Sequence, residues 1–507
     1  MSDCSPEPLV SLGDVAGDVV EQSGSTGDFI YVDISSIDRE AKRITNAKSV
    51  MASEAPSRAK QVLRTGDVLV SMTRPNLNAV SLVPDHLDGA IGSTGFHVLR
   101  SKWIQPEFLF GLVQTDGFVD SMCDVVQGAL YPAVRPKDIA AFKFFLPPRN
   151  QQTRIVEKLE ELLSDLDAGV AELKAAQKKL GQYRQSLLKA AVEGALTADW
   201  RKHNTPHESG AQLLQRILTE RRARWEAKQL AKFAEQGKPP SKDWQKKYPE
   251  PVQPDISGLP ELPEGWVWAT VDLCSVDESA ITDGPFGSNL KSSHYQEHGP
   301  RVIRLQNIGD GTFVDAKAHI SESHYRELSK HAVQESDLLI AMLGEVLPRA
   351  CIVPNSVAPA IVKADCARVR VNRDLIKPAV LAAQLNSKPI RDLVARFVKG
   401  IGRPRVNLGH IRAIPVALCS IAEQLRVETV LSDGQLAIER QNEAIELSLK
   451  QSAAQRKNIL KAAFSGQLVP QDPNDEPASV LLERIRAERV VHESEKKPRG
   501  RHAKESA

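Results

Sequence analysis

The strongest constraint on this fold is that the chain repeats itself at long range. The segment RQSLLKAAVEGAL, Arg184 to Leu196, matches RKNILKAAFSGQL, Arg456 to Leu468, at an offset of 272, and seven of the thirteen positions are identical. Upstream, TGDVLVSMTRPNLNAVSLVP, from Thr65, aligns with ESDLLIAMLGEVLPRACIVP. A period this long is too large for a solenoid, so it indicates two duplicated domains, each able to bury its own core.

Both copies have the same two-part organisation. The first part, residues 8–148 and 262–418, contains short apolar runs cut by Gly, Pro and Asn, which is typical of short strands in a mixed α/β domain. The second part is helical, because apolar residues recur with a seven-residue period. The predicted seam consists of Leu159, Leu163, Leu166, Val170, Leu173, Leu180 and Leu187 in the first copy and Leu431, Ile438, Ile445 and Ile459 in the second.

A heptad pattern is also compatible with a helix that packs only on its own domain. Because the pattern occurs in both copies and begins just after a proline in each, we favour pairing of the two helices with each other. Polar residues interrupt the second seam position, as expected of a specific pairing: Gln177 and Arg184, then Asn442 and Arg456. Some thirty helical residues span about 50 Å, which is the length of a spacer.

These patterns predict an α+β chain with six segments. The first copy consists of an α/β domain (1–149) and a helical region (150–232) whose long helix is at 150–193. A Pro/Lys-rich extended linker (233–261) follows. The second copy consists of an α/β domain (262–419) and a helical region (420–490), and a charged, disordered tail (491–507) ends the prediction.

Charge is distributed unevenly along the chain. The totals nearly cancel, with 66 Lys+Arg and 64 Asp+Glu, yet residues 201–250 carry 12 Lys+Arg against 6 Asp+Glu. A second cationic stretch faces only one acidic residue, Asp392, and contains Arg391, Arg396, Lys399, Arg403, Arg405 and Arg412. Arg, Lys and Asn in loops supply the groups that direct readout of DNA needs. Any nucleic-acid surface on this chain is therefore expected to be local.

Motifs for catalysis or cofactor binding do not occur in the sequence. There is no GxxxxGK[ST] phosphate loop, no HExxH, no GxSxG and no NPPY-type methyltransferase motif. The six cysteines form no CxxC pair, which favours reduced, buried thiols over a zinc site. The histidines between His294 and His331 are scattered in a polar stretch and are interpreted as surface residues. No signal peptide or membrane-spanning run is present, so a cytoplasmic protein without a membrane partner is expected.

The whole chain resembles the specificity subunit of type I restriction-modification enzymes. The resemblance rests on the order and duplication of several motifs: GDVLVSM at Gly66, NQQTRIVEKLE at Asn150, LLKAAVEGALT at Leu187, LPEGWVWATV at Leu262, ITDGPFGSNLK at Ile281, RVIRLQNIGDG at Arg301, IAEQLRVETVL at Ile421 and ILKAAFSGQLV at Ile459. The first copy departs from the second, because it has no LPEGW and only SGSTGD, Ser23 to Asp28, in place of the longer glycine-rich loop. Two unlike DNA half-sites are therefore expected.

The resemblance implies a non-catalytic DNA reader. Two target-recognition domains would each read one half of a bipartite, asymmetric site in double-stranded DNA. Their helices would pair as an antiparallel coiled coil with pseudo-twofold symmetry and fix the half-site spacing. Two methyltransferase subunits would dock on this scaffold and bring S-adenosylmethionine for adenine-N6 methylation. Two motor-nuclease subunits would bring ATP and Mg for restriction, while this chain itself would bind no cofactor and no metal.

Candidate base readers were chosen from loop position and side-chain chemistry. They are Arg74, Asn76, Asn78, Tyr131, Arg135 and Lys137 in the first domain and Lys291, Arg304, Asn307, Arg349, Arg403 and Arg405 in the second. Two alternatives from other classes stay open at this point. One is a coiled-coil scaffold without base-specific readout. The other is a self-contained DNA methyltransferase or nuclease.

Overall fold

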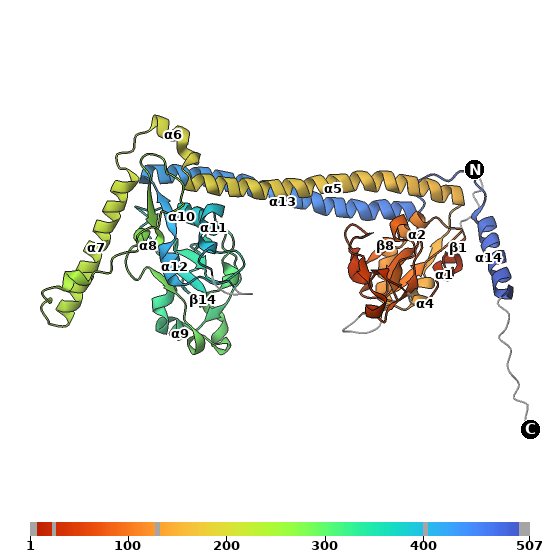
Figure 1. Cartoon of the computed structure of the whole chain (residues 1–507), viewed down its shortest axis with the longest axis horizontal. Coiled ribbons are helices and arrows are strands. Elements are labelled where there is room, and N and C mark those ends of the chain that lie inside the picture. Colours follow the sequence, from red (N-terminus) through yellow and green to blue (C-terminus); the bar gives the residue numbers. More distant parts are fainter. Residues whose placement is uncertain (1–7, 23–26, 127–131, 399–403, 496–507) are drawn as a thin grey trace, which may run out of the picture. The chain divides into compact units, whose positions relative to one another are not determined.

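The computed structural model describes residues 8–22, 27–126, 132–398 and 404–495, and it divides into two compact units. Unit 1 comprises residues 1–174 and 446–507, and unit 2 comprises residues 175–445. Two helices of 44 residues each, α5 (Arg149–Val192) and α13 (Ile421–Phe464), contribute one part to each unit (Figure 1). Each unit therefore contains one α/β part and a section of both long helices.

The α/β part of unit 1 contains two main sheets. An antiparallel sheet has the order β10 (Phe96–Leu99), β7 (Val68–Ser71), β8 (Val80–Leu82). A mixed sheet has the order β5 (Lys48–Val50), β2 (Phe29–Val32), β9 (Ile91–Ser93), β6 (Ala59–Val62). Two ribbons pair β1 (Leu9–Ser11) with β11 (Lys143–Phe145) and β3 (Ile37–Asp38) with β4 (Arg43–Ile44). The helices are α1 (Leu12–Val15), α2 (Pro106–Leu112), α3 (Asp116–Asp124) and α4 (Pro136–Ala140).

The α/β part of unit 2 has the corresponding sheets. The antiparallel sheet has the order β13 (Ile281–Asp283), β20 (Cys366–Val369), β17 (Leu338–Ala341), β18 (Arg349–Ile352). The mixed sheet has the order β15 (His319–Ile320), β14 (Tyr295–Ile303), β19 (Ala360–Val362), β16 (Ala332–Val333). A ribbon pairs β12 (Val267–Thr270) with β21 (Pro415–Leu418). Its short helices are α8 (Val271–Cys274), α9 (Glu322–Glu327), α10 (Pro378–Leu385), α11 (Lys388–Ala395) and α12 (Leu408–Ala413).

The duplication seen in the sequence is thus also present in the sheet topology. The strand order of the mixed sheet is the same in both units, and the antiparallel sheets differ only by the additional strand β13. A buried carboxylate stands just before the central strand in each unit. Asp67 accepts two hydrogen bonds from Arg100, at 2.7 and 2.6 Å, and Asp337 accepts two from Arg370, at 2.8 and 2.6 Å. These equivalent bidentate pairs fix the start of β7 and of β17.

The predicted seam lies on the less exposed face of both long helices. All eleven seam residues are buried or partly buried, whereas most of the residues between them are exposed. In unit 1, Leu159 shares an apolar cluster with Leu460 and Ala463, so the start of α5 packs against the end of α13. In unit 2, Leu187 shares a cluster with Leu431, so the end of α5 packs against the start of α13. Helix-to-helix packing is therefore present within each unit.

The polar seam residues have different partners in the two copies. Arg456 of α13 is paired with Asp167 of α5, which joins the two helices within unit 1. Arg184 of α5 instead donates to the carboxylate of Asp310 at 2.8 Å, which joins the helix to the α/β part of unit 2. Burial alone would raise the pKa of Asp310, but hydrogen bonds from Arg391 and Arg184 hold it below the usual range.

Two segments differ from the sequence prediction. Helix α7 (Gly210–Glu235) runs into the segment predicted to be an extended linker, and the chain then returns so that Trp244 stacks on Trp225 at 5.7 Å. Helix α14 (Ala478–Glu495) likewise includes the first five residues of the predicted tail. The linker and tail predictions rested on proline and charge content, which do not reveal that Trp244 has an aromatic partner on the helix.

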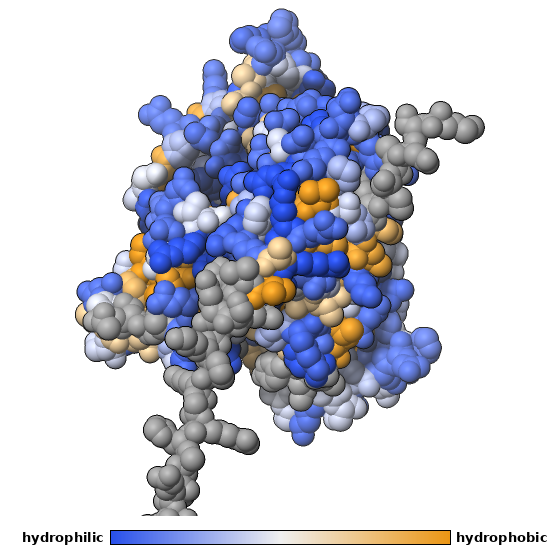
Figure 2. Space-filling view, turned by 90° about the vertical axis from the view of Figure 1, so that its right-hand side faces the viewer, coloured by the Kyte–Doolittle hydropathy of each residue, from blue (hydrophilic) through white to orange (hydrophobic). Residues whose placement is uncertain are grey.

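The surface that faces the viewer in Figure 2 is mainly hydrophilic, with separate small apolar patches. The cross-strand pair Leu9 and Phe145 of the β1–β11 ribbon is among the most exposed apolar pairs, at 56% and 60%. In the part of the chain that the structure describes, no helix combines the length and the apolar character needed to cross a membrane.

Candidate nucleic-acid interface

The segment that follows the central strand of unit 1 forms a tightly held loop. After β7, Val134 N–H donates to Met72 O at 2.8 Å, and Arg74 N–H donates to Pro132 O at 2.8 Å. Arg74 and Asn78 have left-handed backbones, with φ of 49° and 42°, so the chain turns sharply at both ends of this loop. The loop presents Arg74 and Asn76 as exposed side chains.

The segment after the central strand of unit 2 has the same geometry. After β17, Val406 N–H donates to Met342 O at 2.9 Å, and Gly344 N–H donates to Pro404 O at 3.2 Å. Leu343 and Arg405 form an isolated bridge, as Thr73 and Ala133 do in unit 1. The duplicated module therefore places two distant loops side by side at the same point of each copy.

The remaining candidates of unit 1 lie in different environments. Lys137 and Arg135 are exposed, but Arg135 forms an ion pair with Asp138 at 3.0 Å and thereby holds the pKa of that carboxyl below its usual range. Asn78 is partly buried and donates its amide to Val113 O at 3.1 Å. We therefore assign Asn78 to positioning of the loop, and Tyr131 lies outside the described residues.

The candidates of unit 2 divide in the same way. Lys291 and Arg405 are exposed. Asn307 is only 1% exposed, and its side-chain amide donates to Val314 O and Ala316 O, both at 2.8 Å. Because both amide N–H groups are used internally, the structure argues against base readout by Asn307. Arg403 lies outside the described residues.

Two arginines have an intermediate position: Arg349 lines a cleft, and Arg304 directly precedes Leu305, which also lines it. Arg304 donates to the carbonyls of Ala316 and Lys317 at 3.3 and 3.2 Å, and Arg349 donates to Leu305 O at 3.3 Å. Their Nε–H groups are buried without a partner. The cleft measures about 320 Å³ and is lined by Leu305, Gln306, Leu343, Gly344, Glu345, Arg349 and Pro404. It combines the cationic, amide and carboxylate groups that can contact base edges.

Arg405 occupies a mixed polar and aromatic site. Its guanidinium pairs with Asp365 at 2.8 Å and lies 5.7 Å from the centre of the Phe286 ring, which is 48% exposed. Lys363 lies 5.7 Å from the ring of Tyr295. Phe286, Lys363 and Asp365 were not among the predicted site residues, although Phe286 lies in ITDGPFGSNLK, one of the motifs that carry the family resemblance.

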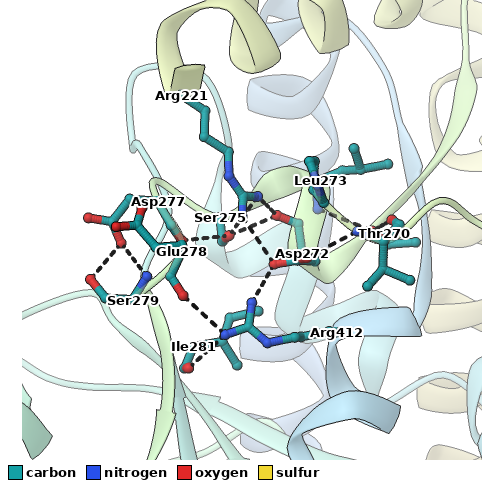
Figure 3. A network of polar contacts seen from close by, with 12 residues as sticks. Arg221, Thr270, Asp272, Leu273, Ser275, Asp277, Glu278, Ser279, Ile281 and Arg412 are labelled. Atoms are coloured by element: carbon teal, nitrogen blue, oxygen red, sulfur yellow. Dashed lines mark hydrogen bonds and ion pairs between the residues drawn. The ribbon is translucent and has the colours of Figure 1, made fainter. Parts of the chain in front are cut away.

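Not every arginine of the cationic stretch 391–412 faces solvent. Arg391 donates to Asp310 at 2.6 Å and to Asn386 at 3.0 Å. Arg412 donates to the buried carboxylate of Asp272 at 2.6 Å, and Arg221 of α7 reaches the same oxygen at 3.3 Å (Figure 3). The network joins α7, α8 and α12, so Arg391 and Arg412 are structural, whereas Arg396 and Arg405 of the same stretch are exposed.

The cysteines have the character expected of core residues. Among the described residues, all five cysteines are free, and four of them are buried. Burial raises the pKa of Cys274, Cys351 and Cys366 to about 12, so these thiols are protonated at neutral pH. The described residues contain no group of three or more His, Cys, Asp or Glu side chains placed to hold a metal ion.

Lys42 contacts the loop that follows β7 in unit 1. It is partly buried, and its Nζ donates to Asn78 O at 2.5 Å. Burial, with a contribution from nearby Arg456, lowers the pKa of Lys42 to about 8. In the unfolded chain, the pKa of this lysine is about 10.4. Between about pH 8 and about pH 10.4, Lys42 is protonated more in the unfolded state than in the folded state. Its contribution to the stability of unit 1 therefore increases as pH rises.

The lowered pKa of Lys42 is expected to add stability to the parent protein between pH 8 and pH 10, and a Lys42→Met variant is expected to lack this contribution. The measurement is the urea midpoint of both proteins at pH 7, 8, 9 and 10. Lys60→Met, which removes an exposed lysine, is the matched control and is expected to follow the parent curve. A constant difference between Lys42→Met and the parent at every pH would contradict the lowered pKa.

Comparison with known proteins gives a consistent set of relatives. The EcoDI specificity subunit of a type I restriction enzyme from Escherichia coli is 23% identical and aligns with 80% of this chain and 81% of its own length. The EcoBI specificity subunit from Escherichia coli is 25% identical over 70% of this chain and 66% of its own length. No family model matches the sequence.

The fold also matches a solved structure. A chain from a structure that describes complex assembly and conformational transition of the type I R-M system superposes with a TM-score of 0.65 at 22% identity. The match covers 92% of this chain and 100% of the solved chain. The mixed α/β fold with long helices is therefore shared with that protein.

Proposed function

Because this chain is a homologue of type I restriction enzyme specificity subunits over most of its length, we propose that it is the non-catalytic subunit that recognises the DNA sequence in a type I restriction-modification complex. The single observation that supports base readout most directly is the duplicated loop pair. Each α/β part carries, beside the end of its central strand, a loop with exposed cationic or amide groups, contributed by Arg74 and Asn76 in one copy and by Arg405 in the other.

The two copies read different half-sites in this proposal. The second copy has the additional strand β13 and the loop with Phe286, whereas the first has Arg74 and Asn76 on a short loop. Arg and Lys form bidentate or single hydrogen bonds to guanine, Asn and Gln to adenine, and Glu accepts from cytosine. The target is therefore bipartite and asymmetric.

The long helices serve as the spacer and as the docking platform. We assign to α5 and α13 an antiparallel coiled coil with pseudo-twofold symmetry, in which the paired helices set the distance between half-sites. Two methyltransferase subunits dock on this scaffold and bind the S-adenosylmethionine used to methylate adenine N6. Two motor-nuclease subunits bind ATP and Mg for cleavage, and the whole complex acts in the cytoplasm.

The decisive test is to sequence adenine methylation in DNA exposed to the chain assembled with its methyltransferase partner. A single bipartite motif is the expected result. Methylation without a motif would point to a scaffold that does not read bases, and methylation by this chain alone would point to a self-contained enzyme. Either outcome would overturn the proposal.

At the level of one residue, Arg405→Ala is expected to weaken or relax recognition of one half-site by about 1–3 kcal/mol, if its guanidinium leaves Asp365 to contact a guanine. Methylation rates on duplexes with single changes in each half-site measure the effect. Arg373→Ala is the matched control, because Arg373 is an exposed arginine of the same unit that pairs with Glu335 at 3.7 Å. Equal methylation by both variants and the parent protein would remove Arg405 from the interface.

A further inference from the structure

Beyond the α/β part of unit 2, helix α7 and the chain that follows it form a separate projection, which we call the arm and define as residues 229–248. The first half of α7 packs on the α/β part through buried Leu213, Ile217 and Arg221. From residue 229 onward, most side chains of the arm are exposed, and the partly buried ones include Phe233, Trp244 and Tyr248. The arm is therefore not needed to cover the main core of the unit.

Aromatic packing gives the arm a defined shape. Trp244 stacks on Trp225 with ring centres 5.7 Å apart and planes 19° apart, and it meets the edge of Phe233 at 6.1 Å. Tyr248 meets Trp225 edge-on at 5.4 Å. Such contacts add stabilisation beyond the burial of their area, so the returning chain is held along the helix although it follows two prolines, Pro239 and Pro240.

The surface of this projection is cationic. Residues 229–248 contain five lysines, Lys232, Lys238, Lys242, Lys246 and Lys247, against two acidic residues, Glu235 and Asp243. All five lysines are exposed. Among the ion pairs of the described residues, only Lys246 has a carboxylate partner, Asp243 at 2.9 Å. Four lysines thus stand on a fixed element without a paired carboxylate.

We propose that the arm binds the phosphate backbone of double-stranded DNA outside the bases that are read. The inference rests on the proposed function, because DNA is the polyanion that such a subunit holds. Lysine is suited to this role as a mobile point charge, and contacts to phosphate position a protein without carrying sequence information. The second copy places a basic sequence, KKPRGRHAK, at the corresponding point after its own LLERIRAER helix, which favours a shared role for the two positions.

The test compares the full chain, assembled with its methyltransferase partner, with a variant in which Lys232, Lys238, Lys242 and Lys247 are all replaced by Gln. DNA affinity is measured at several salt concentrations, on a duplex that contains the methylated motif and on a duplex of random sequence. The logarithm of affinity falls with the logarithm of salt concentration by about 0.9 per neutralised phosphate. We expect the variant to show a shallower slope on both duplexes and an unchanged methylation motif.

A matched control replaces four exposed lysines that lie outside the arm and the long helices, Lys60, Lys143, Lys330 and Lys388, by Gln. It has the same net charge as the arm variant and is expected to keep the parent slope. Equal slopes for the parent and the arm variant, or equal losses in both variants, would overturn the inference. Loss of complex assembly in the arm variant would also overturn it, because the arm would then bind a protein. Failure of the proposed function would appear separately, as a parent complex without preference for any motif.

Discussion

Replacing Asp272 with Ala is expected to lower the free energy of unfolding of unit 2 by about 3–5 kcal/mol. The Asp272 side chain is 5% exposed and lies between Arg221, which is 3% exposed, and Arg412. Its removal leaves the buried guanidinium group of Arg221 and the partly buried one of Arg412 without their carboxylate. Such an uncompensated buried charge costs far more than the loss of a surface ion pair.

The expected damage is larger than the loss of one contact, because Asp272 joins three elements (Figure 3). Its second oxygen accepts from the backbone N–H of Val252 at 3.1 Å, and Arg412 continues the network to Glu278 O and Ile281 O at 3.2 and 3.1 Å. Denaturant unfolding of the full chain measures the stability. Hydrogen exchange in peptides from α7, α8 and α12 shows whether these elements open together, as the network predicts.

Asp392→Ala is the matched control for this experiment. Asp392 also accepts a hydrogen bond from a cation, Lys388, at 2.7 Å, but both side chains are more than half exposed on helix α11. An exposed pair of this spacing contributes only about 0.3–0.5 kcal/mol. If Asp272→Ala lowered stability no more than Asp392→Ala does, the network would not be what holds α7 to the α/β part.

The contrast between Arg405 and Arg412 illustrates how much of the site could be predicted from the sequence. Both lie in one cationic stretch, and loop position and side-chain chemistry made Arg405, but not Arg412, a candidate base reader. Arg412 pairs with Asp272, which is 140 residues away in the sequence. No local sequence pattern predicts a contact over such a separation. Arg405 pairs with Asp365 at the surface. The tertiary contacts give the physical reason why Arg412 is structural, whereas base contact by Arg405 stays a prediction.

The internal repeat predicted structural equivalence well, because it aligns residues that are far apart in the sequence. It aligned Asp67 with Asp337 and Gln152 with Gln424, and both pairs have equivalent roles in the structure. Gln152 donates to Pro147 O and Gln424 to Cys419 O, each at 3.0 Å, at the starts of α5 and α13. Asn307 was misjudged because a loop Asn that caps its own turn has the same sequence appearance as one that reads a base.

Lengthening α5 and α13 together is expected to lengthen the unread spacer between the half-sites by a predictable number of base pairs. Seven residues inserted after Lys174 and seven after Ile445 preserve the heptad seam in both helices. Each helix then grows by about 10 Å, which corresponds to about three base pairs at ~3.4 Å each. Four residues at each position add about 6 Å, or one to two base pairs, with a local change in supercoil.

Sequencing of adenine methylation in DNA exposed to the assembled methyltransferase measures the spacing directly. Both half-site sequences are expected to stay the same, because the loops that read them are untouched, and only the number of unread base pairs between them changes. The control is a seven-residue insertion after Ser257, in the exposed stretch 255–258, which should leave the motif as it is. A parent spacing retained in the seven-residue variant, with methylation still efficient, would mean that the helices do not set the distance. A spacing that grows with insert length would mean that the paired helices act as the ruler of the complex.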